Sequence, residues 1–177
     1  MKNIRPFNQI TPEIAPSAYV DPAATIIGNV SIGNDSSIWP NVSIRGDLLK
    51  ISIGNNSNVQ DNSVIHTTRF YDKSGKGFDV VVGDGVTIGH SVTLHGCHIG
   101  NRVLVGMGAI VLDGVVVEDD VMIAAGSVVT PGKRLQSGYL YLGSPAKQAR
   151  ALTDAEKDMI KKNAIDYVET KNQYQIG

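Results

Sequence analysis

The feature that most constrains the fold of this chain is a six-residue spacing between aliphatic side chains. Counted in steps of six, the pattern shifts by three residues after Ile44, is interrupted after Ile65 and loses one residue after Leu94. All 17 positions in this register hold Val, Ile or Leu: Val20, Ile26, Ile32, Ile38, Ile44, Ile53, Val59, Ile65, Val82, Ile88, Leu94, Ile99, Val105, Val111, Val117, Ile123 and Val129.

A period of six matches neither an α-helix, with its period of 3.6, nor a plain strand, with its period of 2. It indicates short β segments separated by turns, with the aliphatic residue pointing inward. Gly and then Asn often follow, as in Ile53-Gly54-Asn55, and both residue types tolerate positive φ at a turn. An amphipathic helix is disfavoured because each internal Gly costs about 1 kcal/mol. One hexapeptide cannot bury its aliphatic side chain alone, so the repeats predict a stacked all-β solenoid, a parallel β-helix.

This pattern resembles the left-handed parallel β-helix of the hexapeptide-repeat superfamily, in which three hexapeptides form one triangular coil. The left-handedness is implied by the resemblance, since crossover connections in β structures are generally right-handed. Seventeen repeats correspond to about five to six coils stacked roughly 4.8 Å apart.

Two segments depart from the repeat. Residues 67–79 have no periodic aliphatic residues and are expected to form a loop that protrudes from the solenoid. Thr153 and Glu156 have the spacing of a capping box, which predicts a helix over about 154–170. The expected organisation is a β-helix domain over 1–150 and a C-terminal segment over 151–177 whose helix packs on the solenoid. The face expected to pack is Ala155, Met159, Ile160, Ala164, Tyr167 and Val168.

The composition argues against several classes of partner. With 16 basic and 17 acidic residues, the formal net charge is −1. The chain therefore has no excess of positive charge to attract nucleic acid or a membrane surface. No apolar run approaches the roughly 20 residues that span a bilayer, and residues 1–16 do not resemble a signal peptide. The single cysteine, Cys97, cannot form an intrachain disulfide, in keeping with a reducing compartment. A cytoplasmic protein is therefore expected.

Three of the four histidines have informative positions in the repeat. His66 follows Ile65 and His95 follows Leu94, so the two share a phase and should stack on adjacent coils, where both can bind one metal ion at about 2.0–2.1 Å per nitrogen. His90 comes two residues after Ile88 and is expected to point away from that pair. A second copy of the chain could supply it, so we expect an intersubunit site in a homotrimer. Three protein ligands leave a coordination position open for water.

The positions of other polar residues in the repeat can be compared in the same way. Arg45 and Gln60 each come directly after an inward position, and Asp61 has the phase of His90, so Asp61 and His90 should stack. Arg45 is expected to pair with an acidic residue such as Asp47, because unpaired buried charges are costly; a purely structural role for Arg45 and Asp61 is an equal alternative. His98 is expected to be a solvated surface residue, and Cys97 a small packed residue.

At these residues the sequence resembles the γ-class carbonic anhydrases. The matching segments are Ile44-Arg45-Gly46-Asp47, Val59 to His66, Gly89 to Cys97 and Tyr141 to Lys147. The resemblance implies a homotrimer with zinc or iron at each subunit interface, bound by His66 and His95 of one subunit and His90 of the next. It also implies an interface ion pair of Arg45 with acidic partners such as Asp61, Gln60 beside the metal-bound water, and a tyrosine that lines the site: Tyr167, or alternatively Tyr139 or Tyr141.

The implied activity is reversible hydration of CO2 to bicarbonate, in which a metal lowers the pKa of its bound water from about 15.7 to about 7 and the resulting hydroxide attacks CO2. The best-known members carry a glutamate where this chain has Leu48, and an acidic loop for proton transfer. Here the 67–79 loop holds Asp72 and Asp79 but no glutamate. Because general acid–base help is typically worth about 10²–10⁴-fold, a missing shuttle is expected to make proton transfer rate-limiting.

Two other functions remain open from the sequence. A hexapeptide acyltransferase that uses acetyl-CoA would share the solenoid but needs only one histidine as a base. A catalytically weak, metal-binding trimer would keep the three ligands without the reaction. Three imidazoles suit zinc and iron alike.

Overall fold

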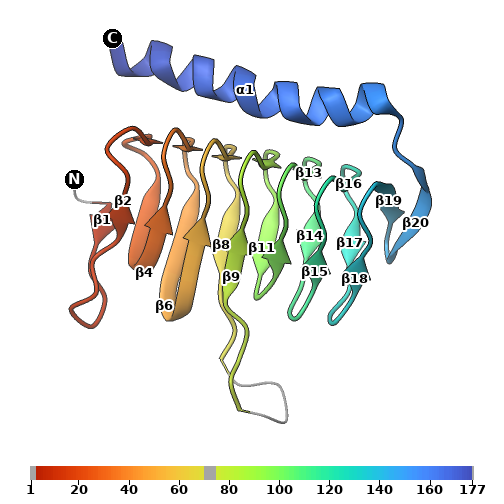
Figure 1. Cartoon of the computed structure of the whole chain (residues 1–177). Helices are drawn as coiled ribbons and strands as arrows, with labels where there is room; N and C mark the ends of the chain where they lie inside the picture. Colours follow the sequence, from red (N-terminus) through yellow and green to blue (C-terminus); the bar gives the residue numbers. More distant parts are fainter. Residues whose placement is uncertain (1–2, 70–74, 177) are drawn as a thin grey trace.

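The computed structural model describes residues 3–69 and 75–176. The chain winds into a left-handed parallel β-helix of about 7 turns followed by one C-terminal helix (Figure 1). The expected fold class is therefore confirmed, with more coils than the five to six that were expected. The additional coils come from the ends, where Ile4 pairs in parallel with Ile26 and Leu135, six residues after Val129, continues the core beyond the 17 register positions.

Each full coil contributes one short strand to each of three faces, numbered here so that the chain passes from face 1 to face 2 to face 3 within a coil. Face 1 consists of β3 (Tyr19–Val20), β5 (Ser37–Ile38), β7 (Asn58–Val59), β10 (Thr87–Ile88), β13 (Leu104–Val105), β16 (Met122–Ile123) and β19 (Tyr139–Gly143), with β20 (Ala146–Ala151) antiparallel to β19. Face 2 consists of β1 (Ile4–Arg5), the first parts of β4 (Thr25–Ile32) and β6 (Ser43–Ile53), then β8 (Val64–His66), β11 (Thr93–His95), β14 (Ile110–Val111) and β17 (Val128–Val129). Face 3 consists of β2 (Glu13–Ile14), the second parts of β4 and β6, then β9 (Val80–Val82), β12 (His98–Ile99), β15 (Val116–Val117) and β18 (Arg134–Leu135).

The core is the column of aliphatic side chains inside the three faces. Every residue of the six-residue register is buried except Val20, which is partly buried at the N-terminal end. Residues two positions earlier, such as Val86 before Ile88 and Val92 before Leu94, are buried as well and fill the corners. The core thus contains more buried residues than the six-residue register alone predicts.

The glycines that follow the inward residues have a different role from the expected one. Gly54 is not among the residues with positive φ, which instead include Asn56 two positions later. A Cβ atom on Gly54 would lie 2.6 Å from the carbonyl oxygen of Gly83 on the next coil, so this position needs glycine because the coils approach closely. The expectation that these glycines supply positive φ was wrong.

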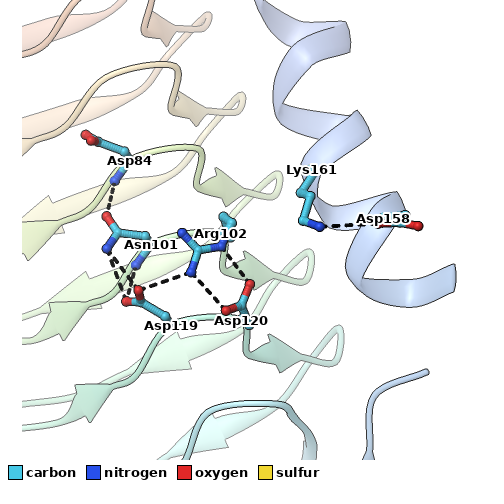
Figure 2. Close-up of polar contacts among 7 residues, drawn as sticks. All are labelled: Asp84, Asn101, Arg102, Asp119, Asp120, Asp158 and Lys161. Atoms are coloured by element: carbon cyan, nitrogen blue, oxygen red, sulfur yellow. Dashed lines mark hydrogen bonds and ion pairs between the residues drawn. The ribbon is translucent and has the colours of Figure 1, made fainter. Parts of the chain in front are cut away.

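Four of these glycines are followed by Asn or Asp, and these side chains, with Asp119, form a ladder of hydrogen bonds along one edge of the solenoid. The side-chain oxygen of Asn101 accepts a hydrogen bond from the backbone N–H of Asp84 at 2.9 Å, and that of Asp119 accepts one from Asn101 at 2.8 Å (Figure 2). Arg102, next to Asn101, forms ion pairs with Asp119 and Asp120 on the following coil. These side chains satisfy backbone donors that the turns leave unpaired.

Helix α1 (Asp154–Ile176) covers face 1 and runs back toward the N-terminal coils (Figure 1). Its start has the expected capping box, since Thr153 Oγ1 accepts from the Glu156 N–H and Glu156 accepts from the Thr153 N–H. The helix extends beyond the predicted end at about 170. Ile160 and Ala164 are buried as expected, but Ala155 and Met159 are exposed, so that part of the predicted face was wrong. Among the described residues, no helix has the length and apolar character needed to cross a membrane.

The C-terminal half of α1 is held by an ion pair and an aromatic cluster. Lys171, whose side chain is 2% exposed, lies 3.1 Å from a carboxylate oxygen of Asp35 at a solenoid corner. The indole ring of Trp39 contacts the rings of Tyr167 and Tyr174, with centroid distances of 5.6 and 5.2 Å. These contacts fix Tyr167 against face 1.

The expected protrusion leaves the solenoid between β8 and β9 (Figure 1). At its base, Thr68 and Phe78 form an antiparallel bridge with backbone hydrogen bonds of 3.0 and 3.2 Å. Asp72, one of the two acidic residues expected there, lies outside the described residues, whereas Asp79 lies at the end of the segment and pairs with His98.

Candidate metal centre

His66 and His95 lie side by side where the chain leaves face 2. They end the adjacent strands β8 and β11 and are directly paired in the parallel register, as their shared phase predicts. The ring centroids are 5.3 Å apart, and Nδ1 of His66 lies 3.3 Å from Nε2 of His95. Two ring nitrogens therefore converge on one point beside the solenoid.

The other nitrogen of each ring contacts a carboxylate. Nε2 of His66 lies 3.0 Å from Oδ1 of Asp47, and Nδ1 of His95 lies 2.8 Å from Oδ1 of Asp113. Asp47 in turn accepts a hydrogen bond from Arg45, so the expected Arg45–Asp47 pair is present. Such carboxylate partners hold metal-binding histidines in one tautomer and orientation.

Burial and neighbouring charge keep His66 neutral and Asp47 ionised. Burial lowers the pKa of His66 below its ordinary value, with the hydrogen bond to Asp47 acting in the opposite direction. Burial would raise the pKa of Asp47, but the hydrogen bonds from His66 and Arg45 outweigh it and hold that pKa below its usual range. A neutral imidazole with one nitrogen bound to a carboxylate can offer the lone pair of its other nitrogen to a cation.

The His66–His95 pair fits a transition metal. Two nitrogens at 2.0–2.1 Å from a tetrahedral ion lie about 3.3–3.4 Å apart, and the facing nitrogens are 3.3 Å apart. Imidazole nitrogen is a ligand that suits both zinc and iron. Within residues 3–69 and 75–176, however, no three His, Cys, Asp or Glu side chains are grouped to hold a metal ion. One subunit thus offers two converging nitrogens, and a third ligand has to come from elsewhere.

His90 lies at the other edge of face 2, on the turn between β10 and β11. Its Nδ1 atom is 3.0 Å from Oδ2 of Asp61, which occupies the same place one coil earlier. The predicted stacking of Asp61 and His90 is therefore confirmed. Both side chains are partly exposed, at 45% for His90 and 39% for Asp61, so neither is enclosed by its own chain.

Gln60 and Tyr167 lie beside His90. All three line a hollow of about 330 Å³ between α1 and face 1, together with apolar residues that include Leu104 and Met107. Nε2 of Gln60 donates to Oδ1 of Asn58 at 3.1 Å. Burial and the nearby charge of Asp61 raise the pKa of Tyr167 above its ordinary value. Tyr167, and neither Tyr139 nor Tyr141, is thus the tyrosine next to the candidate residues.

The sequence-derived site residues therefore form two groups on opposite edges of face 2. One group contains Arg45, His66 and His95, at the corner where the chain leaves the face. The other contains Gln60, Asp61, His90 and Tyr167, at the corner where the chain enters it. Among the described residues Arg45 pairs with Asp47 and Asp61 with His90, so an Arg45–Asp61 ion pair, as the family resemblance implies, could form only between two subunits.

Two residues near the site have other roles. His98 lies on face 3, half exposed, with Nε2 2.7 Å from Asp79. Cys97 is buried, and burial raises the pKa of its thiol well above the usual range, which disfavours the thiolate that a metal would need. The expectations that His98 is a surface residue and Cys97 a packed one agree with this geometry.

Asp113 and Thr68 contact His95 but were not foreseen from the sequence. Asp113 lies on the coil after His95, 18 residues later, whereas paired positions on these two coils, such as Leu94 and Val111, are 17 residues apart. It occupies a different phase, two residues after the inward Val111, and a comparison limited to equal phases misses it. An acidic residue within one position of a candidate ligand's counterpart on the next coil was the available signal.

Comparisons with known proteins agree with this architecture. The family description "Bacterial transferase hexapeptide (six repeats)" matches residues 96–131. Protein YrdA of Escherichia coli K12 is 50% identical over 97% of this chain and 93% of its own length. A carbonic anhydrase of Geobacillus kaustophilus is 41% identical over 97% of this chain and 90% of its own. Gamma carbonic anhydrase 1, mitochondrial, of Arabidopsis thaliana is 45% identical over 88% of this chain, which spans 56% of that protein.

Among solved structures, a hexapeptide transferase family protein from Anaplasma phagocytophilum superimposes with a TM-score of 0.91. It is 41% identical in sequence, and the match covers 98% of this chain and 99% of that one. Both the solenoid and the C-terminal region therefore have a counterpart in a related protein.

Proposed function

Because the chain belongs to the γ-class carbonic anhydrase-like family of hexapeptide-repeat proteins, we propose that it is a metal-dependent carbonic anhydrase that interconverts CO2 and bicarbonate. The observation that carries the proposal is the pair of facing nitrogens on His66 and His95, 3.3 Å apart, with each ring held by a carboxylate on its other side. Zinc, or alternatively iron, is the proposed metal.

The working form is a homotrimer with one site at each subunit interface. His66 and His95 of one subunit and His90 of the next are the three ligands. The two groups lie on different edges of face 2, so a head-to-tail arrangement around a threefold axis brings unlike edges together and closes the ring. The outward positions between the edges include apolar Val64, Ile110 and Val128, and Val64 is 42% exposed. An apolar strip of this kind favours burial in an interface.

When bound, the metal supplies the Lewis acidity that makes water a nucleophile near neutral pH. The protein's own groups then orient the reactants. The amide of Gln60 would hydrogen-bond the attacking oxygen or a carboxylate-like product, a role supported by its lining the same hollow as the phenol of Tyr167. Arg45 and Asp61 hold the interface and the orientation of His90 through their pairing. Leu48 in place of an acid removes one route for protons, so we expect slower hydration than in family members with the acidic shuttle.

The cytoplasm is the proposed location. Its support is the unpaired, buried thiol of Cys97, which suits a reducing compartment.

Metal analysis and stopped-flow CO2 hydration on the purified protein test this function together. We expect about one zinc or iron ion per chain and a hydration rate well above that of His90→Ala, which removes one ligand. A protein that binds no metal would refute the proposal. A metal-loaded trimer no faster than His90→Ala would instead be the catalytically weak metal-binding trimer.

Acyl transfer from acetyl-CoA is the second candidate. It is favoured by the His90–Asp61 contact at 3.0 Å, since a histidine oriented by a carboxylate is a typical general base. His90 also opens onto the hollow lined by Leu104 and Met107. Calorimetric titration with acetyl-CoA distinguishes the two functions: binding by the wild type would favour the transferase, and the absence of binding favours the hydratase.

A further inference from the structure

The carboxylate of Asp113 contacts both His95 and Thr68. Its Oδ1 atom lies 2.8 Å from Nδ1 of His95, and it also accepts a hydrogen bond from the hydroxyl of Thr68. Thr68 is 2% exposed, and its Oγ1 atom is 3.0 Å from the same ring nitrogen. Two polar groups thus converge on the nitrogen of His95 that points away from His66.

The backbone next to His95 is shaped to admit this carboxylate. Gly96 has φ +55, and a Cβ atom there would collide with Oδ1 of Asp113 and lie 3.0 Å from Oγ1 of Thr68. Any larger residue would displace Asp113 from the ring. The contact between His95 and Asp113 therefore depends on the absence of a side chain at Gly96.

The base of the protrusion belongs to the same arrangement. Thr68 is bridged to Phe78 through backbone hydrogen bonds, and the ring of Phe78 lies 3.1 Å from the position of a Cβ atom on Gly114, the residue after Asp113. The hydroxyl that holds Asp113 is itself fixed by this two-stranded base. The base of the protruding segment, at Thr68 and Phe78, consequently helps to set the orientation of His95.

We propose that Asp113, held by Thr68, is a positioning residue that directs Nε2 of His95 toward His66 and sets the metal affinity of the pair. This inference rests on the proposed function, because it needs His95 to be a ligand. Asp113 accepts the N–H of Nδ1, which leaves the lone pair on Nε2, the atom 3.3 Å from His66. It also increases the electron density on the ring. Partners of this kind are typically worth about 10–100-fold in metal affinity.

Competition with a chromophoric chelator measures the affinity of the metal-free trimer for Zn²⁺ and Co²⁺ without any assay of turnover. Asp113→Ala should weaken binding by about 10–100-fold. Asp113→Asn, which keeps the volume and an acceptor oxygen, should weaken it less, as should Thr68→Val. The matched control is Asp79→Ala, which removes a His–Asp contact of 2.7 Å at His98, outside the candidate site, and should leave the affinity unchanged.

The visible spectrum of the Co²⁺-loaded protein reports coordination geometry and should change in Asp113→Ala but not in Asp79→Ala. Light scattering and thermal unfolding establish that the variants remain folded trimers; if Asp113→Ala does not, Asp113→Asn carries the test. Wild-type affinity and spectrum in both Asp113 variants would overturn the inference while leaving the proposed function intact. Failure of the wild type to bind either metal would overturn both.

Discussion

The ring nitrogens Nδ1 of His66 and Nε2 of His95 face each other at 3.3 Å across one step of the solenoid. The stacked strands β8 and β11 fix the backbone positions, and Asp47 and Asp113 fix the two rings. The arrangement is therefore rigid before any ligand binds. A preorganised pair of donors loses little conformational entropy on binding, which favours affinity.

Replacing a ligand histidine should remove the metal, whereas replacing His98 should not. His95→Ala deletes one of the two converging nitrogens and should lower the bound metal, measured by mass spectrometry of dialysed protein, by at least about 10-fold. His98→Ala removes a half-exposed ring on face 3 that pairs with Asp79. Equal metal content in the two variants would show that His95 is not a ligand.

Gly96→Ala should destabilise the protein more than a glycine substitution with backbone strain alone. Both Gly96 and Gly126 have positive φ, at +55 and +67, but only Gly96 has neighbours within 4 Å of an added Cβ atom. Each Gly→Ala change should lower the free energy of unfolding by about 1–3 kcal/mol through the backbone, and Gly96→Ala should lose more because it crowds Asp113. Urea unfolding of both variants provides the comparison, and equal losses would contradict the crowding argument.

The ion pair between Lys171 and Asp35 should couple α1 to the solenoid. Asp35→Ala leaves the buried ammonium of Lys171 without its carboxylate, and we expect a loss of about 1–3 kcal/mol in the free energy of unfolding, reduced from the fully buried case because Asp35 is partly exposed. In a Lys171→Met background the same change should cost little. A double-mutant cycle by chemical denaturation measures this coupling, and identical losses in both backgrounds would show that there is none.

The capping box should stabilise the protein in a pH-dependent way. Hydrogen bonds from Arg150, and then from the Thr153 N–H, lower the pKa of Glu156 from 4.5 to about 2. The folded state then binds fewer protons than the unfolded state between these values, so the contribution is complete above about pH 4.5 and declines as the pH falls toward about 2. The difference in Tm between wild type and Glu156→Gln should accordingly be larger at pH 6 than at pH 3. A constant difference would argue against the ionised cap, and Glu169→Gln, on the exposed side of the same helix, serves as the control.

The six-residue register predicts the solenoid because it reports directly which side chains are buried. It also predicts the stacking of His66 on His95 and of Asp61 on His90, since residues of equal phase occupy equal places in successive coils. It does not predict the contact of Asp113 with His95, because the two residues differ in phase. The contact is possible because Gly96, which follows His95, has no side chain to block it. Nor does the register predict Lys171, which is buried because Asp35, 136 residues earlier in the chain, lies opposite it. The role of Gly54 was also misjudged, because the approach of the next coil cannot be read from a single repeat.

The central claim is that each site is assembled from two subunits, and mixing inactive subunits tests it most directly. His90→Ala chains retain the His66–His95 pair, and His95→Ala chains retain His90. In trimers reassembled at random from equal amounts, a complete site needs one chain of each kind in the correct order, so about one quarter of the sites should be restored. We predict that metal content and CO2 hydration both recover to about one quarter of the wild-type values, whereas no recovery from reassembled trimers would contradict an intersubunit site.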